Sequence, residues 1–108
     1  MNKAIIISGN LAQDHEFIYP YYRLLEEGFN IDVCLLEGKP VQGILGTAIP
    51  PNKDQAIKKI DEVFVKDYKV LVLPGGVKAM EKVRQEKKII DFISEFNKTQ
   101  KTIACICS

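Results

Sequence analysis

The sequence predicts an α/β protein whose mostly parallel sheet is covered by helices on both faces. Two observations support this prediction. First, short apolar runs alternate with helix-like segments along the chain, which is typical of strands joined by helical crossovers. Second, residues 3–8 (KAIIIS) form a continuous apolar run, as expected of a strand that is buried on both faces. At 108 residues the chain is at most one domain, or part of one.

The first part of the chain contains two predicted core strands with a helix between them. The second strand is expected at residues 30–36 (NIDVCLL). The helix is expected to begin at Asp14, a favourable N-cap residue, and to end near Glu27, followed by Gly28. Pro20 falls inside this helix and should bend it, unless the main helix begins there.

Glycine and proline interrupt the pattern in the middle of the chain, and regular segments return after it. Four core strands are expected in all, with the fourth buried. The elements expected in this part are a β-hairpin at residues 41–49, a helical turn near 60–64, a third core strand at 69–73 (KVLVL), helices at about 77–83 and 86–97, and a fourth core strand at 102–106.

Composition excludes several classes of protein. Fifteen basic and fourteen acidic residues give a net charge of +1, which argues against a nucleic-acid-binding surface. No apolar run approaches the roughly 20 residues that cross a bilayer, so no membrane span is expected. Three cysteines without a metal-type histidine pattern favour reduced thiols in a cytoplasmic protein and predict no metal site.

The last six residues, 103–108 (IACICS), carry the candidate reactive group. They form a predicted strand that leads directly into Cys107. A strand ending in a nucleophile is half of a nucleophile elbow, the sharp turn that lifts a reactive side chain above an α/β sheet. Cys107 is therefore the candidate nucleophile, and its alternative role is that of a buried structural cysteine. Cys34 and Cys105 are expected to pack in the core.

Three segments together resemble the DJ-1/PfpI superfamily, the ThiJ-type, class I glutamine-amidotransferase-like proteins. They are residues 14–21 (DHEFIYPY), 73–76 (LPGG) and 104–107 (ACIC), and the first is most similar to the PfpI branch. The resemblance implies a flavodoxin-like three-layer sandwich. Residues 1–108 would be the N-terminal part of one such domain, ending at the nucleophile elbow.

The resemblance implies a catalytic site assembled from these three segments. Cys107 corresponds to the elbow cysteine, and Glu16 to the acidic residue that hydrogen-bonds its sulfur. Gly75 and Gly76 correspond to a turn whose backbone N–H groups help to bind an oxyanion, together with the elbow amide at Ser108. General chemistry agrees, because a thiol with a pKa of about 8.5 needs stabilisation of its anion at neutral pH. In the structural alternative, Glu16 is an ordinary first-turn acid and the glycines are a plain turn.

The implied activity is that of a cysteine-dependent enzyme with a small reactive carbonyl or acyl substrate. Its best-specified form is glyoxalase- or deglycase-like chemistry in stress response, without a metal or an organic cofactor. One alternative is a protease- or amidase-like hydrolase. Another is a non-enzymatic redox sensor or chaperone-like protein, in which Cys107 is oxidised to sulfinic acid.

Two departures from the family pattern bear on these alternatives. PfpI-like members often have histidine after the cysteine, whereas Ser108 follows Cys107 in this chain, which weighs against the protease-like alternative. His15 is the only histidine and a candidate base, or else a solvated first-turn residue. Family members also continue beyond the elbow, so the remainder of the domain is expected as a separate chain or segment. The resemblance implies a homo-oligomer as well.

Overall fold

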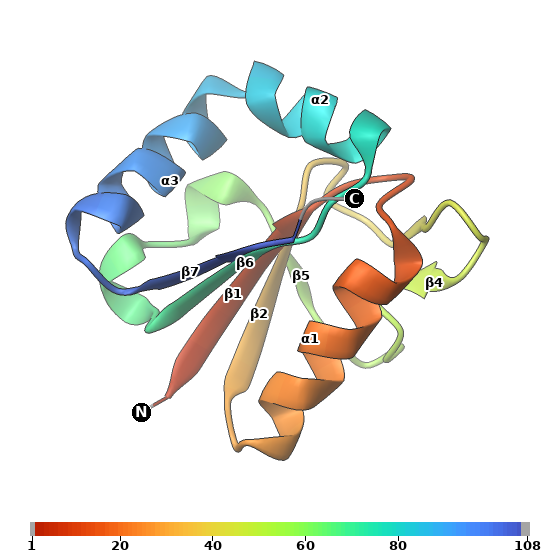
Figure 1. The fold of residues 1–108 in the computed structure, drawn as a ribbon, viewed down its shortest axis with the longest axis horizontal. Coiled ribbons are helices and arrows are strands. Elements are labelled where there is room, and N and C mark those ends of the chain that lie inside the picture. Colours follow the sequence, from red (N-terminus) through yellow and green to blue (C-terminus); the bar gives the residue numbers. More distant parts are fainter. Residues whose placement is uncertain (1, 107–108) are drawn as a thin grey trace.

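A five-stranded, all-parallel sheet forms the centre of the computed structural model, which describes residues 2–106 (Figure 1). The α/β class is therefore confirmed, and the order of the four longer strands is that of a flavodoxin-like sheet. The strands in spatial order are β5 (Ile57–Lys58), β2 (Asn30–Leu35), β1 (Lys3–Ser8), β6 (Val70–Leu73) and β7 (Thr102–Cys105).

Helices cover the two faces of this sheet in the way that right-handed crossovers require. Helix α1 (Asp14–Glu26) connects β1 to β2, while α2 (Val77–Gln85) and α3 (Lys87–Lys98) connect β6 to β7. The connection from β1 to β2 and the connection from β6 to β7 run in opposite directions along the sheet. Because both are right-handed crossovers, α1 and α3 lie on opposite faces (Figure 1).

The side chains of β1 alternate between two hydrophobic cores. Ala4 and Ile6 pack in the core that contains Phe17 and Tyr21 of α1. Ile5 and Ile7 pack in the second core, which α3 supplies with Ile89, Phe92 and Phe96. Burial on both faces explains why the first strand is a continuous apolar run, because both sets of alternating positions must be apolar.

Helix α1 largely follows the prediction, except at its first residue. It runs without interruption through Pro20, so the main helix does not begin there. Gly28, at a φ of +87°, follows the helix, and its N–H and that of Phe29 donate to carbonyls of the last turn. The expectation that Asp14 caps the helix is wrong. Gln13 occupies the N-cap position, because the Asp14 carboxylate binds a different segment, described below.

The middle of the chain contains one strand that the sequence did not reveal. The expected hairpin is present as β3 (Val41–Gln42) and β4 (Ala48–Ile49), and the expected helical turn as the 3-10 turn η1 (Ile60–Glu62), followed by a second turn, η2 (Val65–Asp67). Strand β5 pairs with β2, so the sheet in the described part of the chain has five strands and not four. Two residues without periodicity carry no sequence signal for a strand.

Strand β7 is less buried than predicted. Among residues 2–106 it is the edge strand of the sheet and pairs with β6, and both Thr102 and Cys105 are exposed. The prediction that Cys105 packs in the core is therefore wrong for this structure. Cys34 is buried as predicted, and burial, assisted by the charge of Glu62, raises the pKa of its thiol to about 12. No helix within residues 2–106 is long and apolar enough to cross a bilayer.

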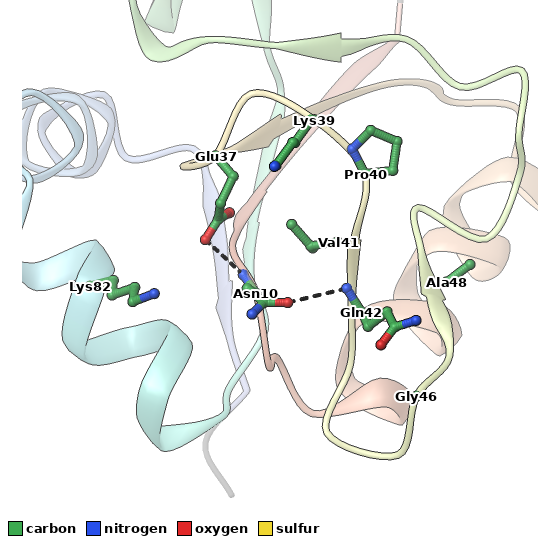
Figure 2. Close-up of a pocket in the computed structure, with 9 residues that line it drawn as sticks. All are labelled: Asn10, Glu37, Lys39, Pro40, Val41, Gln42, Gly46, Ala48 and Lys82. Carbon is green, nitrogen blue, oxygen red and sulfur yellow. Dashed lines mark hydrogen bonds between the residues drawn. The ribbon is translucent and has the colours of Figure 1, made fainter.

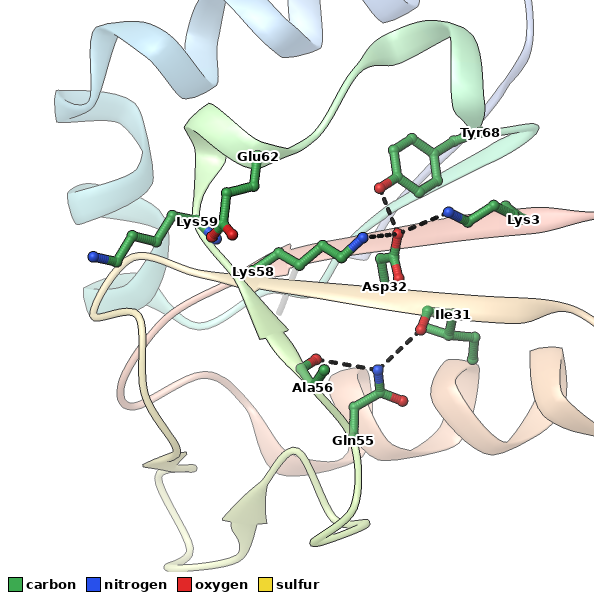
Figure 3. Close-up of polar contacts among 9 residues, drawn as sticks. All are labelled: Lys3, Ile31, Asp32, Gln55, Ala56, Lys58, Lys59, Glu62 and Tyr68. Atoms are coloured by element: carbon green, nitrogen blue, oxygen red, sulfur yellow. Dashed lines mark hydrogen bonds and ion pairs between the residues drawn. The ribbon is translucent and has the colours of Figure 1, made fainter.

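A polar network on β2 joins three other segments of the fold (Figure 3). The Asp32 carboxylate accepts a hydrogen bond from Tyr68 at 2.6 Å and pairs with the ammonium groups of Lys3 and Lys58, each at 3.2 Å. Burial alone would raise the pKa of Asp32, but these hydrogen bonds and charges outweigh it and lower that pKa. The ionised carboxylate therefore contributes to stability.

Replacing Asp32 with Asn should lower the free energy of unfolding at pH 7 by about 1–3 kcal/mol, because it leaves the partly buried partners without their anion. The folded-state pKa is depressed, so this contribution is present above the unfolded value of about 3.9 and is lost as the pH falls through the folded value. Urea unfolding from pH 7 to pH 3 should therefore show a shallower acid decline for the variant. Asp91→Asn, in the exposed pair with Lys87, should change stability by less than about 0.5 kcal/mol. Equal acid declines in wild type and Asp32→Asn would contradict the prediction.

Candidate functional site

Two turns meet at the edge of the sheet where the parallel strands end. One connects β1 to α1 and the other connects β6 to α2. Gly75 joins them through both of its backbone groups. Its carbonyl accepts a hydrogen bond from the Gln13 N–H at 3.0 Å, and its N–H donates to Glu16 Oε1 at 2.9 Å. Ligands of open α/β sheets bind at this edge, so the place where the two turns meet is a candidate site.

Gly76 lets the two turns approach each other. Its φ of +120° is a conformation that side-chain-bearing residues rarely adopt. A Cβ at this position would lie 2.8 Å from the Gln13 nitrogen and 3.0 Å from the Ala12 Cα. Both the backbone conformation and the contact with residues 11–13 therefore require glycine.

Strand β7 runs toward the same corner. Cys105 is in register with Leu73, the last residue of β6, and the Ile106 N–H donates to the Leu73 carbonyl at 3.1 Å. The chain is thus described to within one residue of Cys107. Cys107 and Ser108, predicted as the nucleophile and an oxyanion donor, lie outside the described residues.

An apolar cavity of about 290 Å³ borders this corner. Helix α2 forms one wall and strands β6 and β7 contribute another, so the cavity adjoins both the glycine turn and the end of β7. Its lining residues are Leu73, Gly75, Gly76, Val77, Met80, Glu81, Arg84, Cys105 and Ile106.

The hydrogen bond between Glu16 and Gly75 determines which of their polar atoms can still bind a substrate. Because Gly75 donates to Oε1, the other carboxyl oxygen of Glu16, Oε2, keeps its hydrogen-bonding capacity with respect to residues 2–106. The Gly75 N–H is already used by this contact. Of the two glycine amides predicted to bind an oxyanion, only that of Gly76 donates to no residue in the described part of the chain.

His15, the candidate base, is exposed on α1. It lines a separate surface pocket on that helix with residues that include Tyr19, Tyr22 and Glu26. The structure therefore brings Glu16 into contact with Gly75, whereas His15 lines a different pocket from the one that the glycine turn borders. A catalytic role for His15 stays a prediction.

Asp14 supports the first turn of α1 in a way that the sequence did not indicate. Its side chain is 2% exposed and accepts hydrogen bonds from the backbone N–H groups of Leu45, at 2.7 Å, and Thr47, at 3.1 Å. Burial opposes ionisation, but hydrogen bonding by the Thr47 side chain, together with that of these backbone groups, outweighs it and lowers the pKa of Asp14. A Cβ on Gly43 would lie 2.3 Å from Asp14 Oδ2, so the carboxylate needs a glycine there. Asp14 thus holds the β3–β4 loop against the turn that carries Glu16.

A larger pocket, of about 630 Å³, lies farther along the same edge of the sheet (Figure 2). Asn10 follows β1 and Glu37 follows β2, while Lys82 approaches from α2. Sequence reasoning missed this pocket, although polar residues directly after two parallel strands were a signal for it. Within residues 2–106 no group of three or more His, Cys, Asp or Glu side chains is arranged to hold a metal ion.

The sequence matches the family model described as the DJ-1/PfpI family over residues 2–108. It is 33% identical over 105 residues to "Deglycase PfpI" of Pyrococcus furiosus, covering 97% of this chain and 60% of that protein. It is 31% identical over 105 residues to "Deglycase PH1704" of Pyrococcus horikoshii, with the same coverage. The chain thus spans about three fifths of the length of these relatives.

Solved structures agree with this match. A two-domain protein of Anabaena variabilis with DJ-1/ThiJ/PfpI-like and ferritin-like domains superposes with a TM-score of 0.86 at 26% identity, over 99% of this chain and 30% of that one. Drosophila melanogaster DJ-1beta superposes with a TM-score of 0.83 at 24% identity, over 99% of this chain and 55% of that one, and supports the fold alone.

Proposed function

The chain belongs to the DJ-1/PfpI family, and from this we propose that it supplies the Glu16 and glycine-turn side of a cysteine-dependent site for small reactive carbonyls and their adducts. The proposed activity is deglycase- or glyoxalase-like. The names of the Pyrococcus relatives support the deglycase form. The observation that carries the proposal is the hydrogen bond from the Gly75 N–H to Glu16 Oε1, at the corner toward which β7 runs.

This hydrogen bond gives the Glu16 carboxyl a defined orientation. A neutral carboxyl group accepts through its carbonyl oxygen and donates through its hydroxyl. With Oε1 as the acceptor for Gly75, a protonated Glu16 presents its hydroxyl at Oε2. We propose that this hydroxyl donates to the Cys107 sulfur and stabilises the thiolate.

In the proposed first step, the Cys107 thiolate adds to the carbonyl carbon of the substrate. A C–S bond forms, the C=O π bond breaks, and the oxygen takes up the electron pair. Glu16 then transfers its proton to this oxygen, which gives a neutral hemithioacetal and a Glu16 carboxylate.

The developing oxyanion needs donors that the ground state does not already use. The Gly75 N–H is engaged with Glu16, so we propose that the Gly76 N–H and the elbow amide at Ser108 are the oxyanion donors. Gly75 then acts as a positioning residue for Glu16, which refines the role that the sequence predicted for the glycine pair.

Members of the family are commonly oligomeric, and we propose a homo-oligomer for this protein as well. Tyr19 is 70% exposed on the outer side of α1, and Tyr22 and Leu25 on the same helix are exposed too. Such aromatic surface is typical of protein contacts. Light scattering on the full-length protein measures the oligomer mass, and a monomer would contradict this part of the proposal.

Glu16→Gln in the full-length protein should lower kcat/KM for methylglyoxal by roughly a hundredfold or more, because the amide keeps an acceptor for Gly75 but supplies no acidic proton. Glu26→Gln, at the exposed end of the same helix, should change kcat/KM by less than about twofold. Dicarbonyl consumption by the purified proteins measures both. Wild-type protein without turnover of methylglyoxal or its arginine adducts would overturn the proposed function, and full activity of Glu16→Gln would overturn the role of Glu16.

A further inference from the structure

The larger pocket at the sheet edge contains two lysine side chains from separate elements. Lys39 comes from the connection between β2 and β3, and Lys82 comes from α2. In Figure 2 both direct their Nζ atoms toward the space that Asn10 and Glu37 border. Neither ammonium group has a carboxylate within ion-pair distance in residues 2–106.

Glu37, the one acidic lining residue, is directed at the wall of the pocket. Its Oε2 accepts a hydrogen bond from the Asn10 N–H at 3.2 Å. Its Oε1 is buried without a partner among the described residues, 3.4 Å from the position of a Cβ on Gly9. The carboxylate therefore braces the turn after β1, and the lining carries two cations against one anion.

A neutral hydrogen-bond donor also borders the pocket. Asn10 Oδ1 accepts a hydrogen bond from the Gln42 N–H at 3.3 Å, which leaves the side-chain NH₂ of Asn10 as a donor. The Gln42 side chain is exposed and lines the pocket on its hairpin side, directed away from Asn10 (Figure 2). Two ammonium groups and the Asn10 amide at the border of one pocket form an arrangement that suits a small oxyanion.

We propose that this pocket is a subsite for the anionic group, a carboxylate or a phosphate, of a substrate whose carbonyl-derived carbon reacts at the Glu16 and Gly75 corner. The proposal rests on the function proposed above, and it adds the class of substrate, an adduct that carries an anion. Lys39 and Lys82 would attract the anion from two sides of the pocket, with the amide donor of Asn10 between them (Figure 2).

The distance between pocket and corner limits the length of the substrate. Glu37 follows β2, and Gly75 follows β6, with β1 between them. Neighbouring strands lie about 4.8 Å apart, so the two positions are separated by about 10 Å across the sheet edge. A methylglyoxal adduct of an arginine or lysine side chain, with the carboxylate of the same amino acid at its far end, has this reach. A volume of about 630 Å³ accommodates such a molecule.

Direct anion binding tests the subsite independently of turnover. Acetate and inorganic phosphate are titrated separately into ¹⁵N-labelled full-length protein at low ionic strength, and the side-chain amide signals of Asn10 and Gln42 are followed. We expect saturable shifts that weaken roughly fivefold in Lys82→Gln and in Lys39→Gln, and that fade in 1 M NaCl. The anion that saturates at the lower concentration identifies the carboxylate or the phosphate as the ligand group.

Lys78→Gln is the matched control, because Lys78 lies one turn earlier on α2, is exposed and does not line the pocket. This variant should bind both anions as the wild type does. The proposal is overturned if neither anion gives a saturable shift, or if Lys78→Gln weakens binding as much as Lys82→Gln does.

A kinetic comparison then tests whether the subsite serves the reaction. The methylglyoxal adducts of N-acetylarginine and N-acetylargininamide differ only in the carboxylate. We expect KM for the carboxylate adduct to be roughly fivefold to tenfold lower, with similar kcat, and expect this advantage to disappear in Lys82→Gln. Lysine-dependent anion binding without turnover of either adduct would retain the subsite and refute the proposed function. Equal turnover of both adducts in the wild type, without anion binding, would retain the function and refute the subsite.

Discussion

Cys107→Ala in the full-length protein is expected to lower kcat for methylglyoxal and its adducts by on the order of a thousandfold or more. The reason is that the proposed step forms a bond to the Cys107 sulfur, and alanine supplies no nucleophile. Cys107→Ser should also lose nearly all activity, because a serine hydroxyl is far less acidic than a thiol and is a much weaker nucleophile at neutral pH. Steady-state kinetics with both variants measure these losses.

Cys105→Ala is the matched control for this prediction. Cys105 precedes Cys107 by two residues, is exposed on β7 and lines the cavity beside the glycine turn. Its removal should leave kcat within about twofold of the wild type, because it takes no part in the proposed step. An active Cys107→Ala variant would contradict the mechanism. Loss of activity together with a lower Tm in Cys107→Ala would instead indicate the alternative of a structural cysteine.

Gly76→Ala is expected to lower the free energy of unfolding by about 2–5 kcal/mol, the largest stability effect predicted for this chain. A side chain at a φ of +120° is strained, and its Cβ would lie 2.8 Å from the backbone nitrogen of Gln13. Backbone atoms cannot move aside as a flexible side chain does. The variant must therefore separate the two turns, which also moves Gly75 away from Glu16. Urea unfolding measures the loss, and kcat/KM of the remaining folded protein should fall as well.

Gly46→Ala separates the two contributions to this loss. Gly46 has a similar unfavourable φ of +89°, but a Cβ there would have no neighbour within 4 Å. It should cost only the backbone strain, about 1–2 kcal/mol. If the two variants lose the same amount, close approach of the turns contributes nothing, and steric contact with Gln13 does not explain the glycine at position 76.

The core strands were predictable because the polarity of their residues indicates which faces of each strand are buried. The run of residues 3–8 must be apolar at every position to fill two cores at once, and this shows in the sequence. Strand β5 lacked such a signal, because pairing with β2 alone makes Ile57 and Lys58 a strand. The residue type of Cys105 did not indicate its exposure either, since that exposure depends on β7 being at the edge of the sheet that residues 2–106 form.

The candidate site was predictable in location and unpredictable in detail. The carboxyl-end rule and the family resemblance together indicated that Glu16 and the glycine turn lie close, although they are 59 residues apart. Neither indicated that the Gly75 amide binds Glu16, so that of the two glycine amides only that of Gly76 has no acceptor within residues 2–106. Asp14 illustrates the same limit. Its residue type suits a helix cap, but its carboxylate binds Leu45 and Thr47 because the hairpin packs against it.

The sequence by itself determined the α/β class and most of the buried strands, because apolar periodicity and turn residues act over short stretches of chain. Its resemblance to the DJ-1/PfpI family supplied the candidate site residues, whose chemical roles stay predictions. The tertiary structure alone decided which hydrogen-bond donors and acceptors meet at the sheet edge. It paired Glu16 with Gly75, Asp14 with the hairpin, and Lys39 with Lys82 across one pocket. Such contacts join segments far apart in the sequence, and they depend on distances that only the packed sheet and helices define.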